Sequence, residues 1–273
     1  MDLIHPSKSS RQTLKATRYT NIYLIPITVS GALLIWFLVA TIWHFPSFIL
    51  PSPLQVWMRF LKALGDGSLV RHTAITLQEV LAGLALGVST ASILGYLLAK
   101  SKTFERLLSP YIVASQSVPI VAIAPLLVIW FGPGLFSKVL ICALIVFFPV
   151  LVNTIVGLRS VPEELHDLMR SLQATRWQTI RYLEIPAALP VFLGGLRIGA
   201  TLSVIGAVVG EFVGSDRGLG FLINIGRSQY DTALVFVAVF SLIVMALSLY
   251  GLVLLIETRL LSWHQRQEQS TLT

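Results

Sequence analysis

The stretch from Val139 to Leu158 reads VLICALIVFFPVLVNTIVGL and contains no charged side chain. A bilayer core needs about 20 predominantly apolar residues in helical form, so this run predicts a transmembrane helix. The composition of the whole chain points the same way. Of its 273 residues, 55% are hydrophobic and 12% are charged, whereas about 25% of the residues in an ordinary soluble domain are charged. The sequence therefore predicts an all-α integral membrane protein.

Five further apolar stretches flank this run, and each is long enough to cross a bilayer. We expect six transmembrane helices, at about residues 22–43, 75–99, 110–131, 138–158, 191–213 and 232–256. Together they form one domain over residues 21–260, with a cytoplasmic segment at 1–20 and a cytoplasmic tail at 261–273. The single cysteine, Cys142, lies inside such a run and is expected to be a small buried packing residue.

Lysine and arginine residues are unevenly distributed between the two sides of this arrangement. Six spans place both termini on one side, and with the N-terminus inside, the cytoplasmic segments hold 13 of the 20 basic residues and the outer segments hold six. The 13 are Lys8, Arg11, Lys15, Arg18, Lys100, Lys102, Arg106, Arg159, Arg170, Arg176, Arg181, Arg259 and Arg266. This excess predicts that both termini are cytoplasmic. It also accounts for the net charge of +7 without a nucleic-acid partner.

Residues 159–190, which we call the polar loop, form the one substantial polar segment between spans. Ser160 precedes Glu163 by three residues, and this spacing predicts a capping box that starts a short helix over 163–172. Thr175 and Gln178 repeat the pattern and predict a second short helix that stops at Pro186. A simple connection needs only a few residues, so we interpret the longer charged loop as a docking surface.

The polar loop resembles a known sequence pattern. From Asp167 the chain reads DLMRSLQ, and after nine residues it reads LEIP at 183–186, with the spacing of the EAA loop of ATP-binding-cassette (ABC) importer permeases. Asp167 stands where that pattern has Glu, and Gln173 stands where it has Gly. The resemblance extends to LPSPLQVW at 50–57, SVPIVAIAPLLVIWFG at 117–132, LPVFLGGLRIG at 189–199 and GEFVGSDRGLGFLI at 210–223. These stretches are similar to the permeases for nitrate, sulfonate, taurine and pyrimidine precursors.

The resemblance implies the transmembrane subunit of a type I importer in the inner membrane of a prokaryote. Its expected partners are a second copy of the permease, most simply a homodimer, two cytoplasmic ATPases that hold ATP and Mg, and an external substrate-binding protein. The chain contains no G-x-x-x-x-G-K-[ST] phosphate-binding loop, so we expect no enzymatic activity and no cofactor of its own. The residues expected to couple the ATPase to transport are Glu164, Asp167, Leu168, Met169, Arg170, Gln173, Ala174, Thr175 and Pro186.

Polar side chains inside the expected spans are candidates to line a translocation path, because such groups usually face a cavity or a partner helix. These candidates are Ser115, Gln116, Asn153, Ser203 and Glu211. Helix packing remains an alternative for each of them. For Glu211, two roles stay open: pairing with Arg217 or Arg227 to fix an outer loop, or gating the outer mouth. Glu79 is expected at the level of the outer headgroups. The five histidines show no metal-ligand spacing, so no metal site is expected.

The substrate expected from the resemblance is a thiamine-pyrimidine precursor or a riboflavin-like compound. Nitrate, a sulfonate or taurine, and bicarbonate remain alternatives within the same class of importer. From another class, a proton-coupled secondary transporter would place ionisable side chains near the middle of a span. The charged residues of the expected spans lie nearer their ends, which favours the importer.

Overall fold

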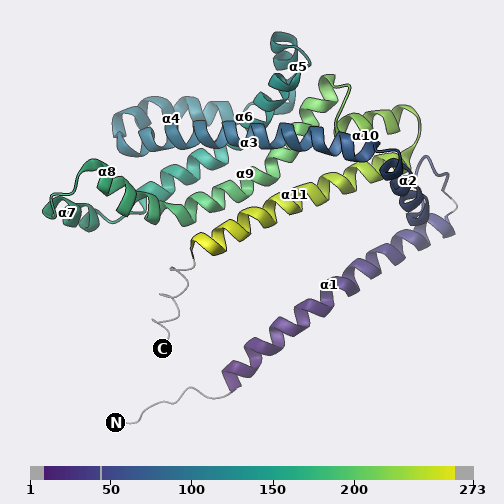
Figure 1. The fold of residues 1–273 in the computed structure, drawn as a ribbon, viewed down its shortest axis with the longest axis horizontal. Helices are drawn as coiled ribbons and strands as arrows, with labels where there is room; N and C mark the ends of the chain where they lie inside the picture. The colour runs from purple at the N-terminus through teal and green to yellow at the C-terminus, as the bar shows by residue number, and fades with distance from the viewer. Residues whose placement is uncertain (1–8, 44, 262–273) are drawn as a thin grey trace.

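The computed structural model describes residues 9–43 and 45–261, with side chains from residue 26 onward. Every regular element in this part of the chain is helical, which confirms the all-α prediction. Figure 1 labels the helices. Their bounds are α1 Ser9–Ile42, α2 Pro53–Gly65, α3 Ser68–Lys100, α4 Lys102–Gln116, α5 Ile120–Phe131, α6 Leu135–Arg159, α7 Glu163–Ser171, α8 Arg176–Thr179, α9 Ile185–Gly214, α10 Leu219–Ser228 and α11 Thr232–Leu260.

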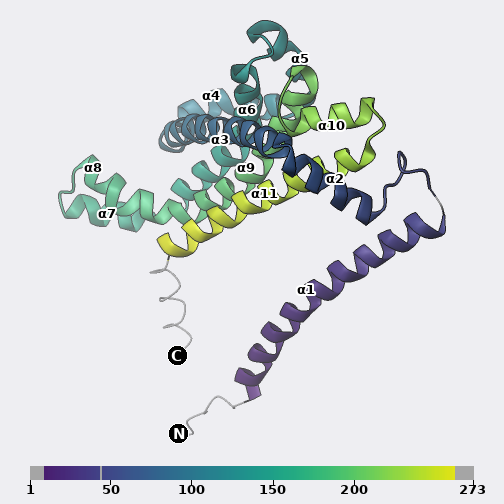
Figure 2. The ribbon, with the colours of Figure 1, turned by 45° about the vertical axis from the view of Figure 1, so that its right-hand side comes forward.

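The centre of the molecule consists of α3, α6 and α9, which run side by side (Figures 1 and 2). Cys142 of α6 is fully buried where the three helices meet. A Cβ at Gly83 of α3 would lie 2.2 Å from the Cys142 Cβ, and one at Gly206 of α9 would lie 2.7 Å from the Cys142 Cα. Small residues at these crossings let the backbones approach closely. The packing role predicted for Cys142 is confirmed.

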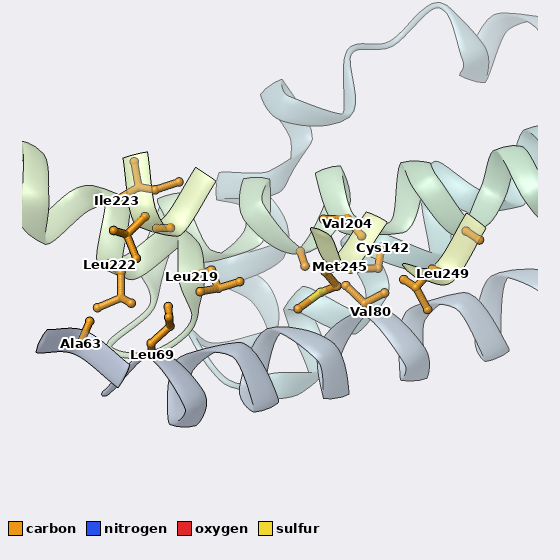
Figure 3. Close-up of a cluster of buried hydrophobic side chains, with 14 of the residues drawn as sticks. Ala63, Leu69, Val80, Cys142, Val204, Leu219, Leu222, Ile223, Met245 and Leu249 are labelled. Carbon is orange, nitrogen blue, oxygen red and sulfur yellow. The ribbon is translucent and has the colours of Figure 1, made fainter. Parts of the chain in front are cut away.

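A second layer of packing joins α2, α10 and α11 to this centre. Figure 3 shows the buried apolar cluster that they share with α3, including Ala63, Leu69, Leu222 and Met245. By contrast, α1 diverges from the other helices toward its N-terminal end, as both ribbon views show. Near its C-terminal end, Trp36 stacks on Phe236 of α11 with 5.2 Å between ring centroids.

The expected third span is not one straight helix. Helices α4 and α5 meet at an angle of 94° across the break at residues 117–119. Pro119 has no backbone N–H to continue the helical hydrogen bonds of α4, and it precedes the first residue of α5. Among the described residues, four helices are long and apolar enough to cross a membrane, or up to five if the bent pair counts as one span. The apolar part of α1, Pro26–Ile42, is shorter, so the count of six remains a prediction.

The polar loop contains two short helices, as expected, but their ends differ from the prediction. Helix α7 begins after Pro162 without a side-chain cap, because the Ser160 hydroxyl instead donates to the Gly157 carbonyl. The capping box of Thr175 and Gln178 is present at the start of α8. The prediction that this helix stops at Pro186 is wrong. A π-helical turn at Ile180–Glu184 joins α8 to α9, and Pro186 lies in the first turn of α9, where its missing N–H is tolerated.

Candidate functional site

The polar loop projects from one end of the helix bundle, which we call the loop end (Figure 1). Several large apolar side chains of the loop are exposed. They are Leu165, Leu168, Leu172, Trp177 and Tyr182, with exposed fractions between 40% and 68%. In a segment this polar, a group of exposed apolar side chains is typical of a protein interaction surface.

The turn between α7 and α8 has a defined geometry. The Ala174 N–H donates to the Met169 carbonyl at 3.0 Å, and the Gln173 N–H donates to the Arg170 carbonyl at 2.9 Å. These are the two hydrogen bonds of a Schellman motif, which requires a left-handed residue after the helix. Gln173 occupies that position with φ of 54°. The resemblance places glycine here, so this chain keeps the sharp turn with a residue that adopts it less readily.

Ion pairs attach the base of the polar loop to the neighbouring helices. Lys100, the last residue of α3, contacts Glu184 at 2.6 Å, and the Glu184 side chain is only 4% exposed. Arg159 at the end of α6 donates through both terminal nitrogens to Glu105 of α4, each at 2.6 Å. By contrast, the Asp167–Arg170 pair on α7 is exposed to solvent. The base of the loop is therefore held more firmly than its tip.

A different arrangement lies at the opposite end of the bundle. Thr76 and Glu79 of α3, Lys138 of α6 and Glu211 of α9 form what we call the buried charge cluster, and each of them is 5% exposed or less. The Lys138 ammonium contacts the Glu79 carboxylate at 3.0 Å. It also donates to the Ser215 hydroxyl at 2.6 Å. The second carboxylate oxygen of Glu79, Oε2, is buried and has no hydrogen-bond partner among the described residues.

This cluster fixes the connection between α9 and α10. Glu211 accepts a hydrogen bond from the Thr76 hydroxyl at 2.6 Å and another from the Gly220 N–H. The Thr76 hydroxyl accepts from the Leu219 N–H at 2.8 Å, and His72 Nδ1 accepts from the Gly218 N–H at 2.9 Å. Three side chains on two helices, His72 and Thr76 of α3 and Glu211 of α9, thus bind three consecutive backbone amides at the start of α10.

The structure gives both of these carboxylates partners that the sequence pattern did not indicate. Glu79 is 1% exposed and paired with Lys138 inside the bundle, while its expected level at the outer headgroups stays a prediction. Glu211 does hold a loop, but through Thr76 and the Gly220 amide rather than through Arg217 or Arg227. In the described part of the chain, no three His, Cys, Asp or Glu residues are grouped to hold a metal ion. His5, His44 and His264 lie outside the described residues.

Comparison with known proteins identifies the family. Residues 83–262 match the family described as the binding-protein-dependent transport system inner membrane component. The chain belongs to this family. It is 48% identical over 239 residues to the riboflavin transport system permease protein of Chloroflexus aurantiacus, covering 88% of this chain and 89% of that protein. It is 37% identical over 220 residues to the formylaminopyrimidine transport permease protein of Halalkalibacterium halodurans, covering 81% and 88%.

A solved structure supports the same fold. The inward-facing MetNI methionine ABC transporter matches with a TM-score of 0.62 at 20% identity, over 71% of this chain and 96% of that one. The sequence resemblance to importer permeases is therefore confirmed, and this permease is a multi-pass membrane protein.

The residues predicted to line a translocation path do not lie together in the structure. Ser115 and Gln116 are exposed near the C-terminal end of α4. The Asn153 amide donates to the Pro149 carbonyl at 2.8 Å, and its side chain lies against Gly195 of α9. Ser203 is fully buried and donates to the Ala200 carbonyl. The hydrogen bonds of Asn153 and Ser203 are made within their own helices, whereas Glu211 belongs to the buried charge cluster.

Sequence reasoning missed Thr76 and Lys138 as members of the buried charge cluster, and it missed His72 as a partner of the same backbone segment. They lie 73 to 139 positions before Glu211 along the chain, and local periodicity carries no information about pairs this distant. One signal was present: Glu211 interrupts an apolar run and is followed by Gly218 and Gly220. At Gly218, φ is 102° and an added Cβ would meet the Glu211 carboxylate, so glycine is required there.

Proposed function

We propose that this permease is the transmembrane subunit of an ATP-driven importer and that its polar loop meets a cytoplasmic ATPase. The observation that carries the proposal is the set of exposed apolar side chains on the polar loop, next to a sharply defined turn at Gln173. The interacting residues would be those predicted for coupling, from Glu164 to Thr175, with Pro186 starting the helix that leads back into the bundle. The ATPase would supply the site for ATP and Mg.

The assembly that follows has two permease copies, two ATPases and an external substrate-binding protein. One polar loop per chain calls for two copies to engage two ATPases, and a homodimer is the simplest arrangement. The loop end would face the cytoplasm and the buried charge cluster the outer side, with both termini cytoplasmic. This orientation agrees with the excess of lysine and arginine on the side of the polar loop.

For the substrate, we propose a flat nitrogen heterocycle such as riboflavin or a thiamine-pyrimidine precursor. Support comes from the 48% and 37% identity to permeases named for riboflavin and formylaminopyrimidine. An apolar groove of about 600 Å³ between α3, α4 and α6 is consistent with it, since Tyr111, Phe147 and Phe148 line the groove. Ser115 also lies in this groove and remains a candidate for the path.

The proposal is tested by ATP-dependent uptake into vesicles that contain the permease, its ATPase and its binding protein. The binding protein is first examined by calorimetry with riboflavin, a formylaminopyrimidine and taurine. We expect uptake of the heterocycle that the binding protein holds, and we expect uptake to stop when the ATPase is inactivated by substitution. Uptake that continues with the inactive ATPase would contradict the proposal and favour a secondary transporter.

A further inference from the structure

A polar pocket lies between the polar loop and the C-terminal end of α3. It has a volume of about 600 Å³ between the C-terminal end of α3 and the helices α7 and α8. Tyr96, Lys100, His166, Arg170, Arg176 and Glu184 contribute to its wall. The pocket shares Arg170 and Ala174 with the residues predicted for coupling, but the exposed apolar side chains of the polar loop do not line it.

The basic residues make this pocket suitable for an anion. Lys100, Arg170 and Arg176 bring three positive charges, against the single carboxylate of Glu184. Within the described residues, the Arg176 guanidinium has no hydrogen bond or ion pair, and Arg170 pairs only with the exposed Asp167. Arginine and lysine groups placed in this way are typical of phosphate recognition.

The floor of the pocket is formed by a carboxylate, which requires a hydrogen-bond donor instead of an anion. Glu184 is 97% buried, as its relative exposure of 3% shows. One carboxylate oxygen, Oε1, accepts from Lys100, but Oε2 has no partner among the described residues. A buried carboxylate oxygen without a donor is unfavourable, because it has lost its water and gained no hydrogen bond in exchange. The π-helical turn at Ile180–Glu184 fixes Glu184 in this position, and such turns are frequent at functional sites.

The pocket also lies at the depth of a membrane surface. Residues 80–99 are uncharged and end at Lys100, and the apolar α9 begins directly after Glu184. Tyr96 lies one turn before Lys100, with the Lys100 ammonium 5.9 Å from the centre of its ring. Tyrosine beside a terminal lysine is typical of the boundary between hydrocarbon and headgroups.

We propose that this pocket binds the headgroup of a phospholipid that carries a primary amine, of the phosphoethanolamine class. The phosphate would lie against Arg176, Arg170 and Lys100, and the ammonium would donate to Glu184 Oε2. A plain anion would satisfy the basic residues but would bring no donor to Glu184. A choline headgroup brings a positive charge without an N–H, and so cannot donate to this oxygen.

The test measures lipid retention by the purified permease, using native mass spectrometry after exchange into vesicles of defined composition. Phosphatidylethanolamine competes with phosphatidylcholine that has the same acyl chains. We expect the wild-type chain to prefer the ethanolamine lipid by about tenfold, the effect of one hydrogen bond to a charged group. The mono- and dimethylated headgroups should fall in between, because each methyl group removes one N–H.

Variants then assign the preference to named side chains. Glu184→Gln should reduce the preference between the two lipids to less than about twofold, while Glu163→Gln, an exposed carboxylate outside the pocket, keeps it. Arg176→Gln should weaken retention of both lipids, and its exposed position makes misfolding an unsuitable explanation for that loss. Equal retention by the wild-type chain, or a preference that survives in Glu184→Gln, would overturn the proposal. Soluble phosphoethanolamine at equal concentration should leave the lipid bound; displacement would assign the pocket to a soluble ligand instead.

Discussion

The two ends of the α3, α6 and α9 bundle use charged residues in opposite ways. At the loop end, Glu184 is buried at the base of the loop, but the pairs Asp167–Arg170 and Arg159–Glu105 are reached by solvent, and a sharp turn presents exposed apolar side chains. At the opposite end, Glu79, Lys138 and Glu211 are buried and hold the backbone at the start of α10. Exposed pairs contribute little to stability, whereas a buried charge that loses its partner is strongly unfavourable. The comparison indicates an end built for contact and an end built for rigidity.

The largest effect should follow from removing the cation of the buried charge cluster. Lys138→Met leaves two buried carboxyl groups without their cation, so we expect the free energy of unfolding to fall by about 3–5 kcal/mol. Denaturation of the purified permease in detergent measures this change. Lys62→Met removes an exposed cation of α2 at the same end and should change stability far less.

A second substitution tests whether the stability lost in Lys138→Met comes from the carboxylates that lose their cation. Adding Glu79→Gln to Lys138→Met removes one of the two uncompensated charges and should recover part of the lost stability. Equal, small losses in Lys138→Met and Lys62→Met would show that the buried cluster does not stabilise this end.

A smaller effect of opposite sign is expected in the turn of the polar loop. Gln173→Gly removes the cost of a left-handed residue and should stabilise the turn by about 1 kcal/mol. Hydrogen exchange at the Ala174 amide, which donates to the Met169 carbonyl, should slow about fivefold. Ser171→Gly, at the last residue of α7, should instead speed this exchange, since glycine disfavours helix. Faster exchange in Gln173→Gly would contradict the assignment of strain to this position.

The smallest effect on stability is expected from the exposed pair of α7. Asp167→Asn should change the free energy of unfolding by less than about 0.5 kcal/mol, because both partners are largely in solvent. Thermal denaturation of the permease alone provides the measurement. A loss near that of Lys138→Met would remove the distinction between the two ends.

Local patterns predicted the helices and one of the two capping boxes, because such features depend on residues close in sequence. Thr175 and Gln178 are three positions apart, and their box forms as expected. The bend at Pro119 and the helix that continues through Pro186 were not predicted, because a proline marks a break in a helical pattern without showing whether a bend, a stop or a first helical turn follows. The buried partnership of Glu79 with Lys138 joins two helices 59 positions apart, which no local pattern reports. The resemblance located the polar loop, and the structure explained why position 173 favours glycine.

The central claim is that the polar loop transmits ATP hydrolysis to the bundle, and Leu168→Glu tests it most directly. Leu168 is 54% exposed on α7, so a charge there should leave the fold intact while opposing an apolar contact. We expect co-purification of the ATPase to fall at least tenfold and substrate-stimulated ATP turnover to be lost. Gln229→Glu, which adds the same charge at an exposed position of the opposite end, should retain both. Unchanged co-purification and unchanged ATP turnover in Leu168→Glu would contradict the claim.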